Sequence, residues 1–224
     1  MRTALRRTDR AFTRTELVVV GIIVLFVVAG LMQVKAVRMR EAQVRETCIN
    51  NLREVAMTFR VWNVSATGGS DVRFPMAVST NEKGSMEHIF TGETFRHFQA
   101  MSNELGTPRL LACPAESRPA SPDFGARFSN SNLSYFVGVD AEPVYSQMLL
   151  AGDGRLTNRA GATLGMIRVS RHDTPWWDGP VHGGFGIVAL VDGSTHQMSS
   201  AQLWHHVARF ASFPDTNRLA LPLP

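Results

Sequence analysis

The sequence lacks the short motifs that mark most catalytic and nucleotide-binding sites. It contains no G-x-S-x-G nucleophile elbow, no H-E-x-x-H zinc motif and no glycine-rich phosphate loop. A nucleophilic enzyme would need a Ser or Cys beside an oriented base, and no spacing in the chain indicates one. We therefore expect a protein that is not an enzyme and has neither a cofactor nor a metal.

Charge is absent from residues 17–34, a run of 18 residues (LVVVGIIVLFVVAGLMQV). As a helix the run would span about 27 Å, nearly the thickness of membrane hydrocarbon. A buried helix of a soluble protein would normally show a polar face, and this run has none. The run could also belong to a secretory signal cleaved near Val34-Lys35-Ala36, or it could be a permanent single-span anchor.

Basic residues are concentrated before the apolar run. Residues 1–11 carry four arginines and one aspartate, a net charge of +3, out of +4 for the whole chain. The remainder is thus near neutral and has no basic stripe of the kind that binds nucleic acid, so no nucleic-acid partner is expected. The same asymmetry predicts a cytoplasmic N-terminus, with the rest of the chain outside the inner membrane.

Glycine and proline are both absent from residues 31–67, so nothing in that range should break a helix. Beyond the apolar run, hydrophobic residues recur mostly at steps of three or four positions, which marks one helical face. They are Val37, Val44, Cys48, Leu52, Val55, Phe59 and Trp62. We predict one helix over residues 12–62, about 75 Å long. Its first half (12–34) crosses the membrane, and its second half (35–62) is amphipathic.

Residues 63–224, here called the head, have many turn signals and few long periodic runs. The patterns predict helices over 95–105 and 200–211, and strands over 109–114, 133–140 and 147–154. The clearest element is a hairpin over 185–200, because Asp192-Gly193 lies between two strand-like runs.

Only two cysteines occur, Cys48 and Cys113, and both follow the apolar run. In an oxidising compartment they could form one disulfide, which would close a loop of 65 positions and stabilise the fold by about 4 kcal/mol in theory. Cys48 lies on the predicted apolar stripe, and Cys113 lies on a predicted strand. The alternative is a pair of buried free thiols, since cysteine packs well as a small hydrophobic residue.

Histidines and tryptophans offer weaker signals. His172, His182, Asp192 and His196 could converge across the hairpin, but they lack the close spacing of known metal sites, so we expect no metal there.

Trp176 and Trp177 stand in a loop with Pro and Gly. They would either mark an interface or fill the core of the head.

The stretch Ala11-Phe12-Thr13-Arg14-Thr15-Glu16-Leu17 resembles the cleavage and methylation signature of type IV prepilins and of type II secretion pseudopilins. In that family a short basic leader is followed by Phe as the first mature residue, Glu as the fifth, and a continuous apolar helix. Ala11 stands where Gly is usual, and Arg14 where an apolar residue is usual. Further pieces of the head resemble a subgroup of pseudopilin-like proteins: Cys48 with Asn50-Asn51-Leu52, Phe74-Pro75, residues 95–99, Cys113-Pro114, residues 131–138, and His182 before the Asp-Gly hairpin.

The resemblance implies an α+β, pilin-like fold in which the long helix packs on a small antiparallel sheet. It implies a leader over residues 1–11, cleavage between Ala11 and Phe12 by a prepilin peptidase, and N-methylation of Phe12. Glu16 would then be an assembly residue, because its carboxylate can pair with the new amine of a neighbouring subunit and reduce the cost of burying either charge alone.

The function that follows is a structural subunit of a type II secretion pseudopilus or related filament, held in the bacterial inner membrane with its head in the periplasm. Its partners would be the prepilin peptidase and other pseudopilins, or copies of itself, through the N-terminal helix. The alternative is a membrane-anchored periplasmic binding or enzymatic domain that carries a prepilin-like anchor.

Overall fold

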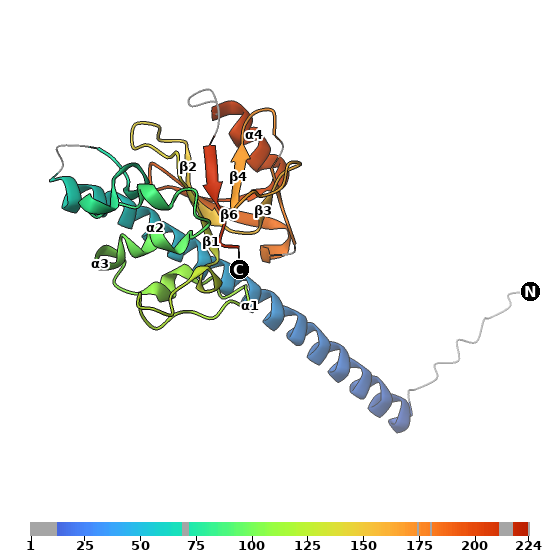
Figure 1. Cartoon of the computed structure of the whole chain (residues 1–224). Helices are drawn as coiled ribbons and strands as arrows, with labels where there is room; N and C mark the ends of the chain where they lie inside the picture. The colour runs from blue at the N-terminus through green and yellow to red at the C-terminus, as the bar shows by residue number, and fades with distance from the viewer. Residues whose placement is uncertain (1–12, 69–71, 174, 180, 211–216, 224) are drawn as a thin grey trace, which may run out of the picture. The chain divides into compact units, whose positions relative to one another are not determined.

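The protein is an α+β chain whose N-terminal helix is by far its longest element. The computed structural model describes residues 13–68, 72–173, 175–179, 181–210 and 217–223 (Figure 1). The chain divides into two compact units, residues 1–43 and residues 44–224. Helix α1, Arg14–Thr67, contributes residues to both units.

The first part of α1 is apolar on every side. Its hydrophobic residues between Leu17 and Val34 are exposed, as Phe26 illustrates with 71% of its surface accessible. Within the part of the chain that is described, this is one helix near the N-terminus that is long and apolar enough to cross a membrane.

Helix α1 ends at Thr67, later than the end predicted at Trp62. The polar residues that follow Trp62 extend the helix by one turn instead of stopping it, because their side chains find partners there. Asn63 donates to the carbonyl of Arg73 at 2.6 Å, and Ser65 donates to the carbonyl of Trp62 at 3.2 Å. The helix stops where Gly68 adopts a positive φ of 64°, which is the usual conformation after a helix C-terminus.

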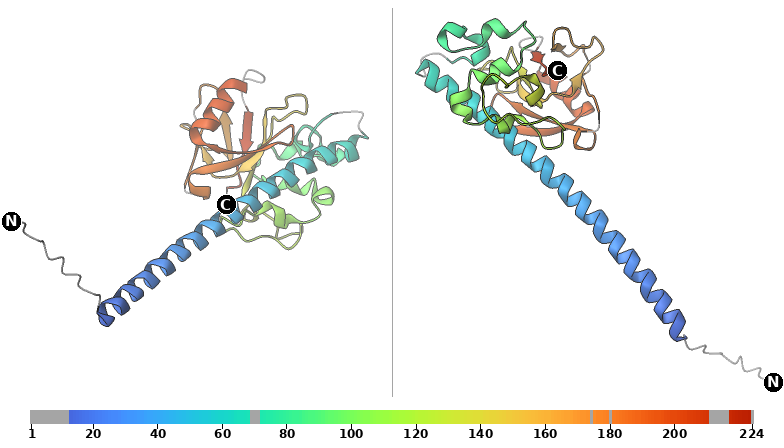
Figure 2. Two further views of the ribbon diagram at one scale, coloured as in Figure 1. Left: turned by 180° about the vertical axis from the view of Figure 1, so that it is seen from behind. Right: turned by 60° about the horizontal axis from the view of Figure 1, so that its bottom comes forward.

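The second part of α1 buries the predicted apolar stripe only from Cys48 onward, because Val37 is 54% exposed and Val44 is half-buried. From Cys48 to Trp62 the stripe is almost fully inaccessible, and Phe59 has 0% of its surface exposed. Phe59 makes edge-to-face contacts with Phe74 and Phe98, at ring-centre distances of 5.7 and 6.4 Å. The stripe therefore forms one wall of the main hydrophobic core. Figure 2 shows the second part of α1 running alongside the head.

A six-stranded antiparallel sheet forms the centre of the head, with strand order β4-β8-β1-β2-β6-β7. Its strands are β1 Tyr135–Gly138, β2 Leu149–Asp153, β4 Met166–Val169, β6 Phe185–Leu190, β7 Thr195–Ser199 and β8 Asn217–Ala220. A separate two-stranded sheet pairs β3, Leu156–Thr157, with β5, Trp176–Trp177.

The two faces of the large sheet are covered by different helices. Tyr135 and Val137 of β1 belong to the core that includes α1, whereas Phe136 belongs to a second core. Helix α4, Ser200–Phe210, covers that second face with Leu203 and Val207. Alternate strand residues thus point to opposite helices, as the period of a β-strand requires.

Most predicted elements of the head are present, with two corrections. The predicted strands over 133–140 and 147–154, the hairpin over 185–200 and the helix over 200–211 correspond to β1, β2, β6–β7 and α4. The hairpin turns through residues 191–194, where Gly193 has a φ of 86°. The predicted helix over 95–105 is instead two short ones, α2 Phe95–Gln99 and α3 Ser102–Leu105, because Met101 leaves helical geometry between them.

The predicted strand over residues 109–114 is wrong. Residues Pro108–Leu111 form a 3₁₀ helix, η4, in which proline occupies the start and Thr107 Oγ1 accepts from the N–H of Arg109 at 3.4 Å. Proline suits a first helical turn because it has no N–H to pair. The other 3₁₀ helices are η1 Pro75–Ala77, η2 Thr80–Glu82, η3 Met86–His88, η5 Asn130–Asn132 and η6 Val181–Gly183.

Candidate functional site

The predicted cleavage site, Ala11 and Phe12, lies outside the residues that the structure describes. Glu16 lies in the first turn of α1, which follows the N-cap residue Thr13. The Glu16 carboxylate accepts from the backbone N–H and the hydroxyl of Thr13, both at 2.8 Å, and the Glu16 N–H donates back to Thr13 Oγ1 at 3.3 Å. This reciprocal arrangement is a capping box.

Glu16 therefore has a local role that the sequence interpretation missed. A Thr followed three residues later by Glu, before an apolar run, is the sequence signal for a capping box, and it is present here as Thr13-Arg14-Thr15-Glu16. The capping role needs a hydrogen-bond acceptor, whereas the assembly role implied by the family resemblance needs a negative charge. The two roles can be separated by substitution.

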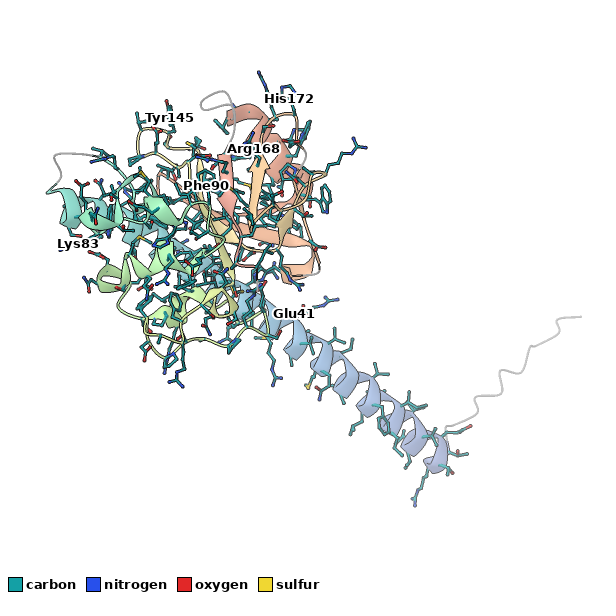
Figure 3. The ribbon with its side chains drawn as sticks, in the orientation of Figure 1. Glu41, Lys83, Phe90, Tyr145, Arg168 and His172 are labelled. Atoms are coloured by element: carbon teal, nitrogen blue, oxygen red, sulfur yellow. A yellow bond between two sulfur atoms is a disulfide. The ribbon has the colours of Figure 1, made fainter. Side chains whose placement is uncertain are left out.

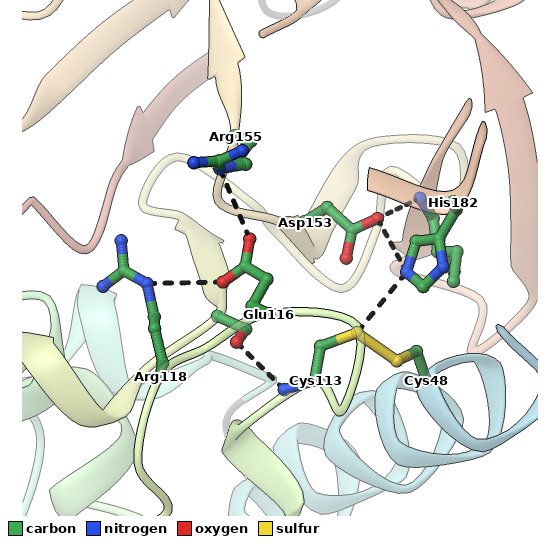
Figure 4. The surroundings of a disulfide bond; sticks show 9 residues. Cys48, Cys113, Glu116, Arg118, Asp153, Arg155 and His182 are labelled. Carbon is green, nitrogen blue, oxygen red and sulfur yellow. Dashed lines mark hydrogen bonds and ion pairs between the residues drawn. A yellow bond between two sulfur atoms is a disulfide. The ribbon is translucent and has the colours of Figure 1, made fainter. Parts of the chain in front are cut away.

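Cys48 and Cys113 form a disulfide, with their Cα atoms 5.4 Å apart. Both cysteines are buried, and the bond joins α1 to the segment after η4 (Figure 4). The backbone N–H of Cys113 donates to Ser134 Oγ at 2.9 Å, which fixes the segment beside β1. The sequence permitted either a disulfide or two free thiols, and the structure contains the disulfide.

A buried polar pair lies against the disulfide. His182 of η6 places Nε2 3.4 Å from Cys113 Sγ and 3.7 Å from Asp153 Oδ2, at the end of β2. Asp153 Oδ2 also accepts from the backbone N–H of Ile187 at 2.7 Å. Figure 4 shows the three side chains converging between the helix and the sheet.

Burial favours the neutral form of both members of this pair. Desolvation raises the pKa of Asp153 to about 7; the Ile187 N–H opposes that rise and the nearby Glu116 charge adds to it. Desolvation also lowers the pKa of His182, and the positive charge of Arg45 lowers it further. Since both shifts oppose ionisation, burial weakens any ion pair between Asp153 and His182.

Glu116 extends the cluster on its other side. Its carboxylate lies 3.3 Å from Arg118 Nε and 3.8 Å from Arg155 Nε, so two guanidinium groups offset the charge of a largely buried acid. The disulfide and the polar groups around it thus connect α1, the segment after η4, β2 and β6. Sequence reasoning did not place Asp153 or Glu116 beside the disulfide, because an acidic residue at a strand end or in a loop normally reaches solvent.

Cys48, Cys113 and His182 are close enough to offer three ligand atoms to one metal ion, all within 4.8 Å of one another. Zinc requires cysteine in its thiolate form, and here both sulfur atoms are in the disulfide. In this oxidised form the cluster has neither a sulfur nucleophile nor a thiolate ligand. Its chemistry is that of a covalent and polar connection between elements of the fold.

The four residues considered for a metal site do not converge. His182 is beside the disulfide, whereas His196 Nε2 lies 2.9 Å from Ser194 Oγ, which donates to Asp192 at 2.6 Å. His172 instead accepts from Arg171 Nε at 3.2 Å. The hairpin thus brings together only Asp192 and His196 of the four, through Ser194.

The two adjacent tryptophans have different surroundings. Trp177 is buried, and its indole ring packs against the backbone of Gly186, where any side chain would collide with it. Its Nε1 donates to the carbonyl of Met198 at 2.8 Å. Trp176 is 40% exposed. Adjacent strand residues point to opposite sides, so one tryptophan packs against the sheet and the other faces outward.

Comparison of the chain with protein-family models, with curated proteins and with solved structures gives no match.

Proposed function

We propose that this protein is a pseudopilin-like structural subunit, processed by a prepilin peptidase and assembled through its N-terminal helix into a secretion pseudopilus or related filament. One observation carries the proposal. A single uninterrupted helix, Arg14–Thr67, has exposed apolar residues on all sides in its first part and a buried stripe in its second. Such a helix can lie in lipid or in a bundle of like helices at one end, while the other end is fixed in the core of the folded unit.

The attachment of α1 to the head supports this role. A subunit that transmits force or position along a filament must not let its helix detach from its head. Here three interactions make the connection: the aromatic contacts of Phe59, the Cys48–Cys113 disulfide, and the hydrogen bond that the Arg60 guanidinium donates to the carbonyl of Asp192 at 3.0 Å. The periplasmic location proposed for the head is consistent with a disulfide, since disulfides persist in oxidising compartments.

The test separates the two roles of Glu16. Glu16→Gln keeps an acceptor for the capping box but removes the charge, whereas Thr13→Ala removes the cap and keeps the charge. Glu41→Gln, which neutralises an exposed carboxylate farther along the same helix, is the matched control. Each full-length variant is co-expressed with a prepilin peptidase and a differently tagged wild-type copy. Co-purification from extracted membranes and the yield of pelleted filaments are measured.

The proposal predicts that Glu16→Gln loses most self-association, while Thr13→Ala and Glu41→Gln retain it. If Thr13→Ala and Glu16→Ala lose association equally while Glu16→Gln retains it, Glu16 acts only as a cap. If all variants associate like the wild type, or if the wild type does not associate, the assembly role is wrong.

A second candidate, a membrane-anchored binding domain, is favoured by one observation, a cleft of about 450 Å³ in the head.

A further inference from the structure

The cleft lies along the edge strand β4, and its lining residues include none from α1 or from the cluster around the disulfide. Six of its lining residues matter here: Phe90, Asn158, Leu164, Arg168, Asp173 and Arg218. Figure 3 labels Phe90 and Arg168 on this side of the head. Its volume of about 450 Å³ is in the range of small-molecule sites, roughly 300–1,000 Å³.

Two arginines meet in this cleft, and only one of them is neutralised. Arg168 of β4 and Arg218 of β8 are direct cross-strand neighbours. Like charges in that position repel each other. Arg218 pairs with Asp140, its Nε lying 2.9 Å from both carboxylate oxygens, and its guanidinium stacks 5.3 Å from the Phe90 ring centre. Over the described ranges the Arg168 guanidinium has neither a hydrogen bond nor an ion pair, so it offers an open positive charge.

Asn158, another residue that lines the cleft, has an unsatisfied side-chain acceptor. The side chain is only 4% exposed, and its Nδ2 donates to the carbonyl of Arg168 at 2.7 Å. That bond assigns the amide orientation, because a carbonyl can only accept. Asn158 Oδ1 is buried and has no hydrogen-bond partner among the described residues. A buried acceptor without a donor is costly, and a ligand N–H would relieve that cost.

The cleft also has an apolar surface, formed by Phe90 and Leu164. Phe90 and Leu164 are 67% and 72% exposed although both line the cleft. Leu164 also has a φ of 50°, a region that a leucine rarely adopts. Asp173, which accepts from Ser170 Oγ at 3.3 Å, places a negative charge in the same cleft and disfavours ligands with several negative charges.

We propose that this cleft binds an N-acylated α-amino acid with an apolar side chain, recognised as a free small molecule or as the C-terminal residue of a polypeptide. The carboxylate pairs with Arg168, the amide N–H donates to Asn158 Oδ1, and the side chain packs on Phe90 and Leu164. The negative charge of Asp173 favours such a monoanion over phosphate. This inference does not depend on the assembly role of α1.

The experiment is calorimetric titration of the full chain in detergent micelles with N-acetyl-leucine. Three further ligands each remove one feature: N-acetyl-leucine amide lacks the carboxylate, the 2-acetoxy acid of the same skeleton replaces the N–H by oxygen, and N-acetyl-glycine lacks the apolar side chain. We expect the amide and the acetoxy acid each to bind roughly ten- to a hundredfold more weakly, as the loss of a charge-assisted or buried hydrogen bond predicts. Inorganic phosphate should not bind.

Variants test the protein side of the same contacts. Arg168→Gln should weaken N-acetyl-leucine binding by a similar factor, whereas Arg109→Gln, at an exposed arginine outside the cleft, should not change it. The acetoxy acid tests the contact of the ligand N–H with Asn158 Oδ1. No substitution of Asn158 is needed, and its hydrogen bond to the carbonyl of Arg168 in β4 stays intact.

Acetyl-Ala-Ala-Leu distinguishes the two sources of the ligand. Tighter binding of this peptide than of N-acetyl-leucine assigns the cleft to polypeptide C-termini, and equal or weaker binding assigns it to a small N-acyl amino acid. The proposal is overturned if N-acetyl-leucine does not bind, if its amide or the acetoxy acid binds equally well, or if Arg168→Gln and Arg109→Gln have the same effect.

Discussion

The two parts of α1 use the same kinds of residue in opposite ways. Phe26, in the first part, is 71% exposed, and Phe59, in the second, is fully buried between Phe74 and Phe98. Backbone geometry is helical in both parts, so the difference lies in the surroundings. Hydrophobicity alone therefore does not define a core: the second part alternates apolar and polar faces and packs on a protein, whereas the first is apolar all round and suits lipid or other apolar helices.

The largest effect should come from exchanging one aromatic residue in each part. Phe59→Ala removes a fully buried ring, and we expect it to lower the free energy of unfolding by about 3–5 kcal/mol. Phe26→Ala should leave that free energy unchanged. Urea unfolding of the full chain in micelles, followed by tryptophan fluorescence, measures both. Equal destabilisation by the two variants would contradict the division of the helix.

The disulfide holds the second part of α1, and its removal should have the next largest effect on stability. Replacing both Cys48 and Cys113 by Ala removes the cross-link over 65 positions, and we expect a loss of about 2–4 kcal/mol. Reduction of the wild type by a dithiol should reproduce the loss, while the double variant should be insensitive to the dithiol. A wild type that unfolds identically before and after complete reduction would show that core packing alone holds the helix.

A charge placed in each part sharpens the comparison, because Val24 and Met57 are almost equally exposed, at 54% and 53%. Val24→Arg should disfavour membrane insertion by about 2.5–3.5 kcal/mol. Met57→Arg should have little effect, since its side chain faces water. The fraction of protein that resists carbonate extraction from membranes measures the difference. Similar retention of the two variants would mean that residues 17–34 do not lie in lipid.

The last prediction concerns the buried pair beside the disulfide. The pKa of Asp153 is raised to about 7 in the folded chain, so between its ordinary value and pH 7 the folded state binds a proton that the unfolded state has lost. The contribution of Asp153 to stability is therefore largest at low pH and falls as the pH rises through that window, by at most about 1.4 kcal/mol per pH unit.

Asp153→Asn removes this dependence. We expect the wild type to gain stability relative to the variant as the pH falls from 7 towards 4, measured as the difference between their urea midpoints. His97 adds an opposite trend to both proteins, because burial lowers its pKa to about 4, but it cancels in the difference. Glu41→Gln, in the other unit, is the control. A difference that is constant with pH would show that Asp153 is not titrating in this window.

Much of this architecture could be predicted from sequence because it depends on local patterns. The apolar run, the stripe from Cys48 to Trp62 and the Asp-Gly hairpin all follow from periodicity or turn chemistry. The end of α1 was misplaced because Asn63 and Ser65 resemble a stop signal and find partners instead.

Features that depend on distant contacts could not be predicted. The pairing of Asp153 with His182 requires β2 and η6 to meet, and the cleft at Arg168 requires β4 to pair with β8. No spacing in the sequence specifies either. The strand expected over residues 109–114 failed for a local reason, since Pro108 favoured a helical turn over an extended run.

The proposal that the chain is a processed subunit assembled through α1 is tested most directly by the intact mass and the N-terminal residue of the protein extracted from membranes. We expect a chain that begins at Phe12 and is heavier by one methyl group. A chain that begins at Met1, or one cleaved after residue 36, would contradict the proposal, because the first would be an unprocessed anchor and the second a protein released from its helix.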